Sequence, residues 1–152
     1  NNSILNLFIN GTEQISIKKE TIKIFSSSNL KNLENTIKRL FSSIAYNNFT
    51  NNEISSYEGF YASVIYSYFA SLGLELIAED VTNKGRIDLT IKFRNKVYIF
   101  EFKVNSNDAL SQIKEKKYYE KYIDPKNEVY IIGIVFDPKE RNITDFEYEE
   151  IK

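Results

Sequence analysis

Two short runs in the middle of the chain alternate between apolar and polar residues, and they constrain the fold more than any other feature. The runs are Arg86–Phe93 and Val97–Lys103. Successive side chains of a strand point to opposite faces of its sheet, so alternation is typical of a strand with one buried face. Because only a few residues separate the two runs, the sequence predicts a β-hairpin.

The predicted hairpin gathers ionisable side chains on one face. If Asn95-Lys96 forms a two-residue turn, Asp88 lies opposite Lys103. The same register places Thr90 opposite Glu101. A three-residue loop would slip the register by one residue and put Asp88 and Glu101 on opposite faces. The other face of the first strand is then apolar and consists of Ile87, Leu89, Ile91 and Phe93.

Glu101 lies within Val97–Val104, a run too apolar for a strand with one side freely in water. A carboxylate buried in such a strand is costly unless a cation or a metal ion compensates its charge. The alternative is a solvated sheet face on which Asp88 and Lys103 form an ordinary cross-strand ion pair, which contributes little.

The segments around the hairpin predict helices and further strands. We expect an amphipathic helix from Asn29, its N-cap, and a second helix from about residue 54 to 72 that Gly73 ends. Residues 1–28 show no clear period and are interpreted as an arm from an upstream domain, so that 29–152 form one domain. Further elements are expected at 74–81 (strand), 108–122 (helix), 129–136 (strand) and 144–151 (edge strand). The predicted fold is α/β, a mixed central sheet flanked by helices in the order α-β-β-β-α-β-β.

The second predicted helix carries a further acid, Glu58. It belongs to the helical stripe that should face the sheet, together with Ala62, Ile65, Phe69 and Leu72. Alternatively, Glu58 is an acidic residue that the helix dipole favours at a helix N-terminus. With Asp88 and Glu101 it would complete a three-carboxylate cluster suited to a hard divalent cation.

Composition restricts the chemistry that the chain can perform. It contains no Cys and no His, so a metal ion must be held by oxygen ligands, which favours Mg²⁺, Mn²⁺ or Ca²⁺. The net charge of -1 provides no overall basic field for nucleic acid, and any phosphate-binding patch must be local. No signal peptide or spanning segment is recognised, so we expect a cytoplasmic protein. The first residue is Asn and Met is absent, which suggests a piece of a longer chain.

The hairpin and the segments beside it resemble the PD-(D/E)XK nuclease superfamily, whose core is restriction-endonuclease-like. The resemblance rests on Gly85-Arg-Ile-Asp-Leu89, on Glu101-Phe-Lys103 at its spacing, and on Gln112 and Tyr118. It extends from about Leu30 to Ile151. More narrowly, the chain is similar to the nuclease-like domain that follows an AAA-ATPase-like domain in bacterial proteins. The proline of the superfamily name is absent, because Ile87 precedes Asp88.

The resemblance implies a metal-dependent nuclease that acts on nucleic acid, with DNA as the expected substrate and Mg²⁺ (or Mn²⁺) as the ion. Asp88 and Glu101 would bind the metal with the backbone carbonyl of Phe102. Lys103 would orient or activate the attacking water and steady the phosphate charge. Two helix residues would complete the catalytic set: Glu58 as the helix acid, a further metal ligand, and Gln112 as a supporting residue.

Contacts with nucleic acid are predicted from basic residues near these groups. Lys84 and Arg86 lie closest to the predicted metal, while Lys117 and Tyr118 belong to a Lys- and Tyr-rich helix after the hairpin. The alternative for that helix is a solvated charged face. Two other readings of the whole domain remain: a catalytically inactive nuclease fold that binds nucleic acid or a protein partner, and a structural module attached to an ATPase.

Overall fold

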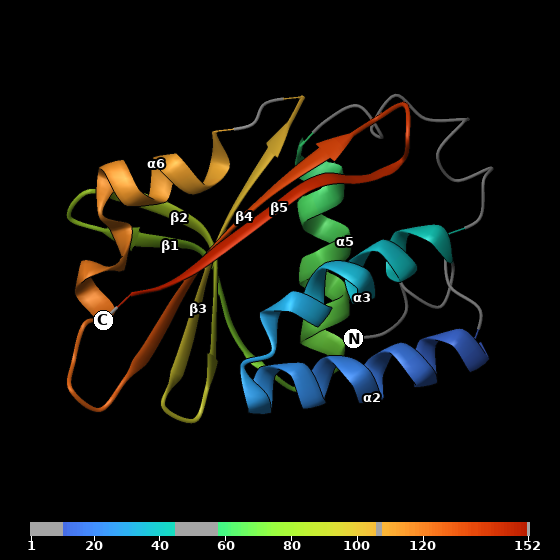
Figure 1. Ribbon diagram of the computed structural model, residues 1–152, viewed down its shortest axis with the longest axis horizontal. Coiled ribbons are helices and arrows are strands. Elements are labelled where there is room, and N and C mark those ends of the chain that lie inside the picture. The colour runs from blue at the N-terminus through green and yellow to red at the C-terminus, as the bar shows by residue number, and fades with distance from the viewer. Residues whose placement is uncertain (1–10, 45–57, 106–107, 152) are drawn as a thin grey trace.

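The computed structural model describes residues 11–44, 58–105 and 108–151, which form a five-stranded sheet with helices against both faces (Figure 1). The strands lie in the sheet in chain order, and only β3 and β4 run parallel to each other. Their bounds are β1 Glu75–Thr82, β2 Gly85–Phe93, β3 Lys96–Val104, β4 Glu128–Asp137 and β5 Asn142–Ile151.

Helices α2, α3 and α5 lie on one side of the sheet, and α6 with the short 3-10 helix η2 lies on the other (Figure 1). The order α5-β1-β2-β3-α6-β4-β5 confirms the predicted α-β-β-β-α-β-β fold, with β5 at the sheet edge. No described helix is long and apolar enough to cross a membrane. The bounds are α2 Gly11–Ser27, α3 Leu30–Ser42, α5 Glu58–Ser71, α6 Ala109–Lys116 and η2 Tyr118–Tyr122.

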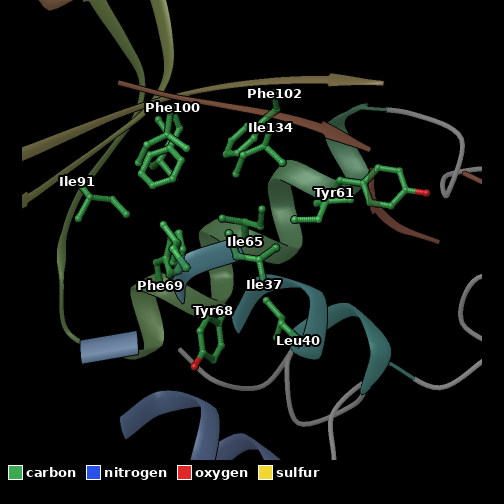
Figure 2. Close-up of a cluster of buried hydrophobic side chains, with 14 of the residues drawn as sticks. Ile37, Leu40, Tyr61, Ile65, Tyr68, Phe69, Ile91, Phe100, Phe102 and Ile134 are labelled. Atoms are coloured by element: carbon green, nitrogen blue, oxygen red, sulfur yellow. The ribbon is translucent and has the colours of Figure 1, made fainter. Parts of the chain in front are cut away.

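The larger core fills the space between the sheet and the helices α3 and α5 (Figure 2). Phe69 of α5 packs against Phe100 of β3, with ring centroids 6.0 Å apart. On α3 the residues at three- and four-residue spacing are all buried, which confirms the predicted amphipathic helix after Asn29. Gly73, two residues beyond the end of α5, has the expected positive φ of 79°. Residues 54–57 of the predicted second helix lie outside the described part of the chain.

Helix α2 belongs to this core, although the sequence reading made residues 1–28 an arm. Ile24 and Phe25 are buried in the cluster, and the Tyr98 hydroxyl of β3 donates a hydrogen bond to the Phe25 carbonyl oxygen at 2.7 Å. Thr21 and Tyr68 join α2 to α5 through their hydroxyls, 3.1 Å apart. The arm prediction is therefore wrong for the part of α2 that contains Thr21, Ile24 and Phe25, which are buried against the rest of the domain. Residues 1–10 lie outside the described residues.

On the opposite side of the sheet the predicted helix over residues 108–122 is broken. Lys117 adopts a left-handed conformation with φ of 54°, which ends α6 and begins η2. Tyr118 and Tyr122 are buried in a second cluster beneath η2. Tyr118 also fills the space beside Gly85, where an added Cβ would lie 3.0 Å from the ring. A straight helix with Ala109 and Ile113 facing the sheet would turn Tyr118 and Tyr122 away from it. The break at Lys117 allows both rings to pack on the sheet as well.

A buried acid, Asp80 of β1, joins η2 to the sheet. Its carboxylate accepts hydrogen bonds from Thr90 at 2.9 Å, from Lys121 at 2.7 Å and from the Tyr122 hydroxyl. Burial alone would raise the pKa of Asp80, but the Lys121, Tyr122 and Thr90 donors outweigh it and hold that pKa below its usual value. These three side chains therefore compensate the negative charge of Asp80.

We expect Lys121→Met to destabilise the fold by about 1.5–3 kcal/mol at pH 7, because it removes a charged donor from a buried carboxylate. A depressed folded-state pKa adds stability above the unfolded value of about 3.9, and this stability is lost as the pH falls through the folded value. The difference between wild type and variant should therefore shrink below about pH 4. Urea unfolding at several pH values measures it, with the exposed Lys126→Met as control. Equal losses in both variants at pH 7 would contradict the role of Lys121.

Candidate active site

The turn of the β2–β3 hairpin consists of Arg94 and Asn95, because Phe93 pairs with Lys96. The predicted turn at Asn95-Lys96 lies one residue later, so the predicted cross-strand register is wrong by two residues. Thr90 lies opposite Ile99 rather than Glu101. The loop still has two residues, and an even shift leaves every side chain of β3 on its predicted face. Arg94 takes the positive φ of 58° that such a turn requires.

Side chains along β2 stop alternating between the two faces of the sheet at Asp88, whereas the sequence predicts regular alternation from Ile87 to Phe93. The bridges between β1 and β2 include Leu89 and Ile87 but pass over Asp88, whose counterpart Glu79 has a φ of 52°. Leu89 is buried in the core beneath α5, whereas Ile87 is buried in the cluster beneath α6. The prediction that Ile87 and Leu89 share a face is therefore wrong. The physical reason is a local irregularity of the β1–β2 pairing at Glu79 and Asp88, beyond which the side chains of β2 point to the other face of the sheet.

At this interruption the Asp88 side chain turns toward β3. Its carboxylate accepts a hydrogen bond from the backbone N–H of Phe102 at 2.8 Å, and it also shares a hydrogen bond with the Glu101 side chain. Glu101 itself is only 3% exposed. Burial raises the pKa of Asp88, although the Phe102 N–H, the charge of Lys103 and the Glu101 hydrogen bond oppose it. A buried carboxyl and a half-buried carboxyl thus meet.

Two further predicted residues surround Glu101. The side-chain amide of Gln112 on α6 donates a hydrogen bond to Glu101 Oε2 at 2.8 Å. Lys103 Nζ lies 3.7 Å from the same oxygen, and the lysine side chain keeps 26% of its surface exposed. The structure therefore brings Asp88, Glu101, Lys103 and Gln112 together. A solvated sheet face with one ordinary ion pair does not describe this arrangement.

Gly133 of β4 allows α6 to reach the site, and the sequence reading missed it. Gly133 pairs directly with Glu101, and a Cβ added there would lie 2.4 Å from the backbone nitrogen of Leu110. The missing side chain lets the first turn of α6 rest on the sheet beside Glu101, so that Gln112 reaches the carboxylate. The available signal was a glycine inside an otherwise apolar strand, which often marks a close backbone approach.

Comparison with known proteins agrees with this geometry. A family model described as the PD-(D/E)XK nuclease superfamily matches residues 56–146, more than half of the chain. The chain belongs to this superfamily. It is also 36% identical, over 146 residues and 91% of its length, to an "Uncharacterized protein in vnfD 5'region" of Azotobacter chroococcum mcd 1. The chain spans 28% of that relative's length.

Within this superfamily member, the buried Asp80 and the half-buried Asp88 have opposite electrostatic environments. Asp80 meets Lys121 at 2.7 Å, and its pKa is lowered. Asp88 is held by a neutral backbone N–H, lies beside a second carboxyl, and its pKa is raised. Neutral donors, the Phe102 N–H and the Gln112 amide, orient the two carboxyls, and the nearest ammonium, that of Lys103, lies 3.7 Å from Glu101 rather than at hydrogen-bond distance, so the pair is suited to bind a further cation. Asp80 therefore has the character of a structural acid, whereas the raised pKa of Asp88 makes it a candidate functional residue.

The donor set at the site suits a hard divalent cation. The described residues include no group of three or more His, Cys, Asp or Glu side chains that could hold a metal ion. The side chain of Glu58, the predicted third acid, lies outside the described part of the chain, although the residue begins α5. Asp88 and Glu101 therefore supply two oxygen-ligand side chains, and oxygen ligands are those that Mg²⁺ and Mn²⁺ accept.

The residues predicted to contact nucleic acid come from the β1–β2 turn and from the junction of α6 and η2, which meet where Tyr118 packs beside Gly85. Lys84 is exposed in the β1–β2 turn, Lys117 is exposed between α6 and η2, and Arg86 pairs with Glu79 at 3.0 Å on the surface. Tyr118 is only 6% exposed, and its ring packs beside Gly85 in the second cluster. A ring that packs in this cluster is not available to stack on a base, and a contact of Tyr118 with nucleic acid stays a prediction.

Proposed function

We propose that the protein is a metal-dependent nuclease that hydrolyses phosphodiester bonds, with DNA as its substrate. The observation that carries the proposal is the convergence of Asp88, Glu101 and Lys103 from two strands, with Gln112 from α6 holding Glu101. Membership of the PD-(D/E)XK nuclease superfamily supports it. We assign Asp88 and Glu101 as the ligands of Mg²⁺ or Mn²⁺, with the Phe102 carbonyl and Glu58 as further ligands. The position of the protein in the cytoplasm is part of the same proposal.

Each residue of the set has a separate task. A bound divalent cation would supply positive charge that favours ionisation of a water molecule and offsets charge on the phosphate. The Phe102 N–H fixes the carboxylate of Asp88, and the Gln112 amide fixes that of Glu101. Lys103 is close to the acids but partly exposed, so its ammonium can contact a substrate phosphate that approaches from solvent. Lys84 and Arg86 are the remaining proposed phosphate contacts.

The expected neighbour of this domain is an AAA-ATPase-like domain in the same longer chain. This part of the proposal comes from the resemblance, and the greater length of the Azotobacter relative agrees with it. Purification of the natural full-length protein followed by an ATP hydrolysis assay tests it. A full-length protein that neither binds nor hydrolyses ATP would contradict it.

The nuclease proposal is tested by incubating the protein with end-labelled single- and double-stranded DNA and RNA. We expect DNA cleavage with Mg²⁺ or Mn²⁺ and none with EDTA, because two neighbouring carboxylates cannot approach a phosphate without a cation. Asp88→Asn should remove cleavage, while the exposed Glu147→Gln on β5 should not. Folded wild type that binds nucleic acid but leaves all four substrates intact would favour a binding module instead.

A further inference from the structure

A cavity of about 490 Å³ opens beside Asp88, on the side of the sheet that α5 covers. Its floor contains Asp88, Leu89 and Phe102, and its walls come from α5 and from Glu79 on β1. The volume falls within the range of roughly 300–1,000 Å³ that is usual for small-molecule sites. The cavity therefore adjoins the candidate active site at Asp88 and is large enough to hold one base and its sugar.

The charge of this cavity argues against a phosphate as its occupant. No Lys or Arg is among the described residues that line it, whereas Glu79 and Asp88 both do. Arg86 forms a 3.0 Å ion pair with Glu79 on the surface. Away from the Asp88 end, which is assigned above to the cation, a phosphate would meet the Glu79 carboxylate, whereas an amino group of a nucleobase can donate a hydrogen bond to it.

The α5 wall presents one large aromatic ring among small side chains. Tyr66 lines the cavity and is 40% exposed, although most aromatic residues of the described chain are buried. Ser63 and Ser67, one turn apart on α5, add hydroxyl groups on the same wall. A flat exposed ring beside small polar residues is a surface on which an unpaired base can stack.

We propose that this cavity takes up one unpaired nucleobase, which stacks on Tyr66 while the adjoining backbone lies at Asp88. The inference rests on the nuclease function proposed above and specifies its substrate as single-stranded or locally unpaired nucleic acid. A base held in a duplex cannot enter without leaving its stack, and that step costs a few kcal/mol. Paired substrate should therefore bind more weakly at this site than single-stranded substrate of the same sequence.

The test is binding of a fluorescent single-stranded DNA oligonucleotide, measured by anisotropy in an Asp88→Asn background that does not cleave. We expect Tyr66→Ala to weaken binding about fivefold or more, since stacking on an aromatic ring is worth roughly that much or more. Ser63→Leu, which fills the cavity from an exposed helix position, should have a similar effect. Tyr66→Phe keeps the ring and should retain binding. Tyr148→Ala removes a comparably exposed ring, 45% accessible, at the far edge of the sheet and serves as control.

A 2-aminopurine base in the oligonucleotide reports on stacking directly through its fluorescence, which Tyr66→Ala but not Tyr148→Ala should alter. Unchanged binding and fluorescence in both Tyr66→Ala and Ser63→Leu would overturn the inference, as would a lack of single-strand binding by the parent. Failure of the nuclease proposal is distinguishable. If binding depends on Tyr66 but wild type does not cleave, the base site is supported and the nuclease proposal is contradicted. If cleavage requires Asp88 but is unaffected by Tyr66→Ala, the nuclease proposal is supported and the base site is contradicted.

Discussion

Lys103→Met is expected to lower the cleavage rate by about a hundredfold to a thousandfold while leaving cation binding intact. The ammonium lies 3.7 Å from Glu101 Oε2 and is partly exposed, so it can face both the acids and an approaching phosphate. Removing one preorganised positive group from the site where charge develops has an effect of roughly that size. Methionine keeps most of the length of the lysine side chain but lacks the charged ammonium group, so the substitution tests the contribution of that group.

Cation binding separates the role of Lys103 from that of the acids. Titration calorimetry with Mn²⁺ should show equal or tighter binding in Lys103→Met, because the variant lacks a positive charge beside the carboxylates. Asp88→Asn should lose cation binding and cleavage together. Lys139→Met, at an exposed position after β4, is the control for loss of a surface lysine. Cleavage by Lys103→Met at the wild-type rate would exclude Lys103 from the reaction.

The order of elements was predictable because periodicity and turn residues report on local structure. Strands β1 to β5, helix α3 and the end of α5 near Gly73 all follow from such patterns. The faces of Glu101 and Lys103 were also predictable, since they depend only on the period of a strand. What the pattern could not specify was register: a two-residue turn at Arg94-Asn95 and one at Asn95-Lys96 give the same alternation.

The remaining errors concern interactions between segments that are distant in the sequence. The change of face at Asp88 depends on Glu79 in a neighbouring strand, and the break at Lys117 follows from the burial of Tyr118 against the sheet. Neither is visible in a single segment, because tertiary contacts override local periodicity there. The candidate site residues were therefore predictable from the sequence, whereas the contacts that hold them in place were not.

Gly133→Ala should destabilise the fold by about 1–3 kcal/mol, the usual cost of overpacking a tight interior. The new Cβ would lie 2.4 Å from the Leu110 nitrogen and 2.9 Å from its Cα, and backbone atoms cannot rotate away as the end of a flexible side chain can. Helix α6 must therefore move off β4. Because Gly133 pairs with Glu101, the movement should draw Gln112 away from the carboxylate that it orients.

The expected functional consequence is a fall in Mn²⁺ affinity of about 10–100-fold, which is typical when a group that orients a metal ligand is lost. Urea unfolding and titration calorimetry measure the two effects on the same sample. Gly59→Ala is the matched control, because a Cβ at this position on α5 meets no described atom within 4 Å. It should change the free energy of unfolding by no more than about 0.5 kcal/mol, because Gly59 is an exposed residue in the first turn of α5. If Gly133→Ala binds Mn²⁺ as tightly as wild type, the contact of α6 with β4 does not position Gln112, and Glu101 is held by other means.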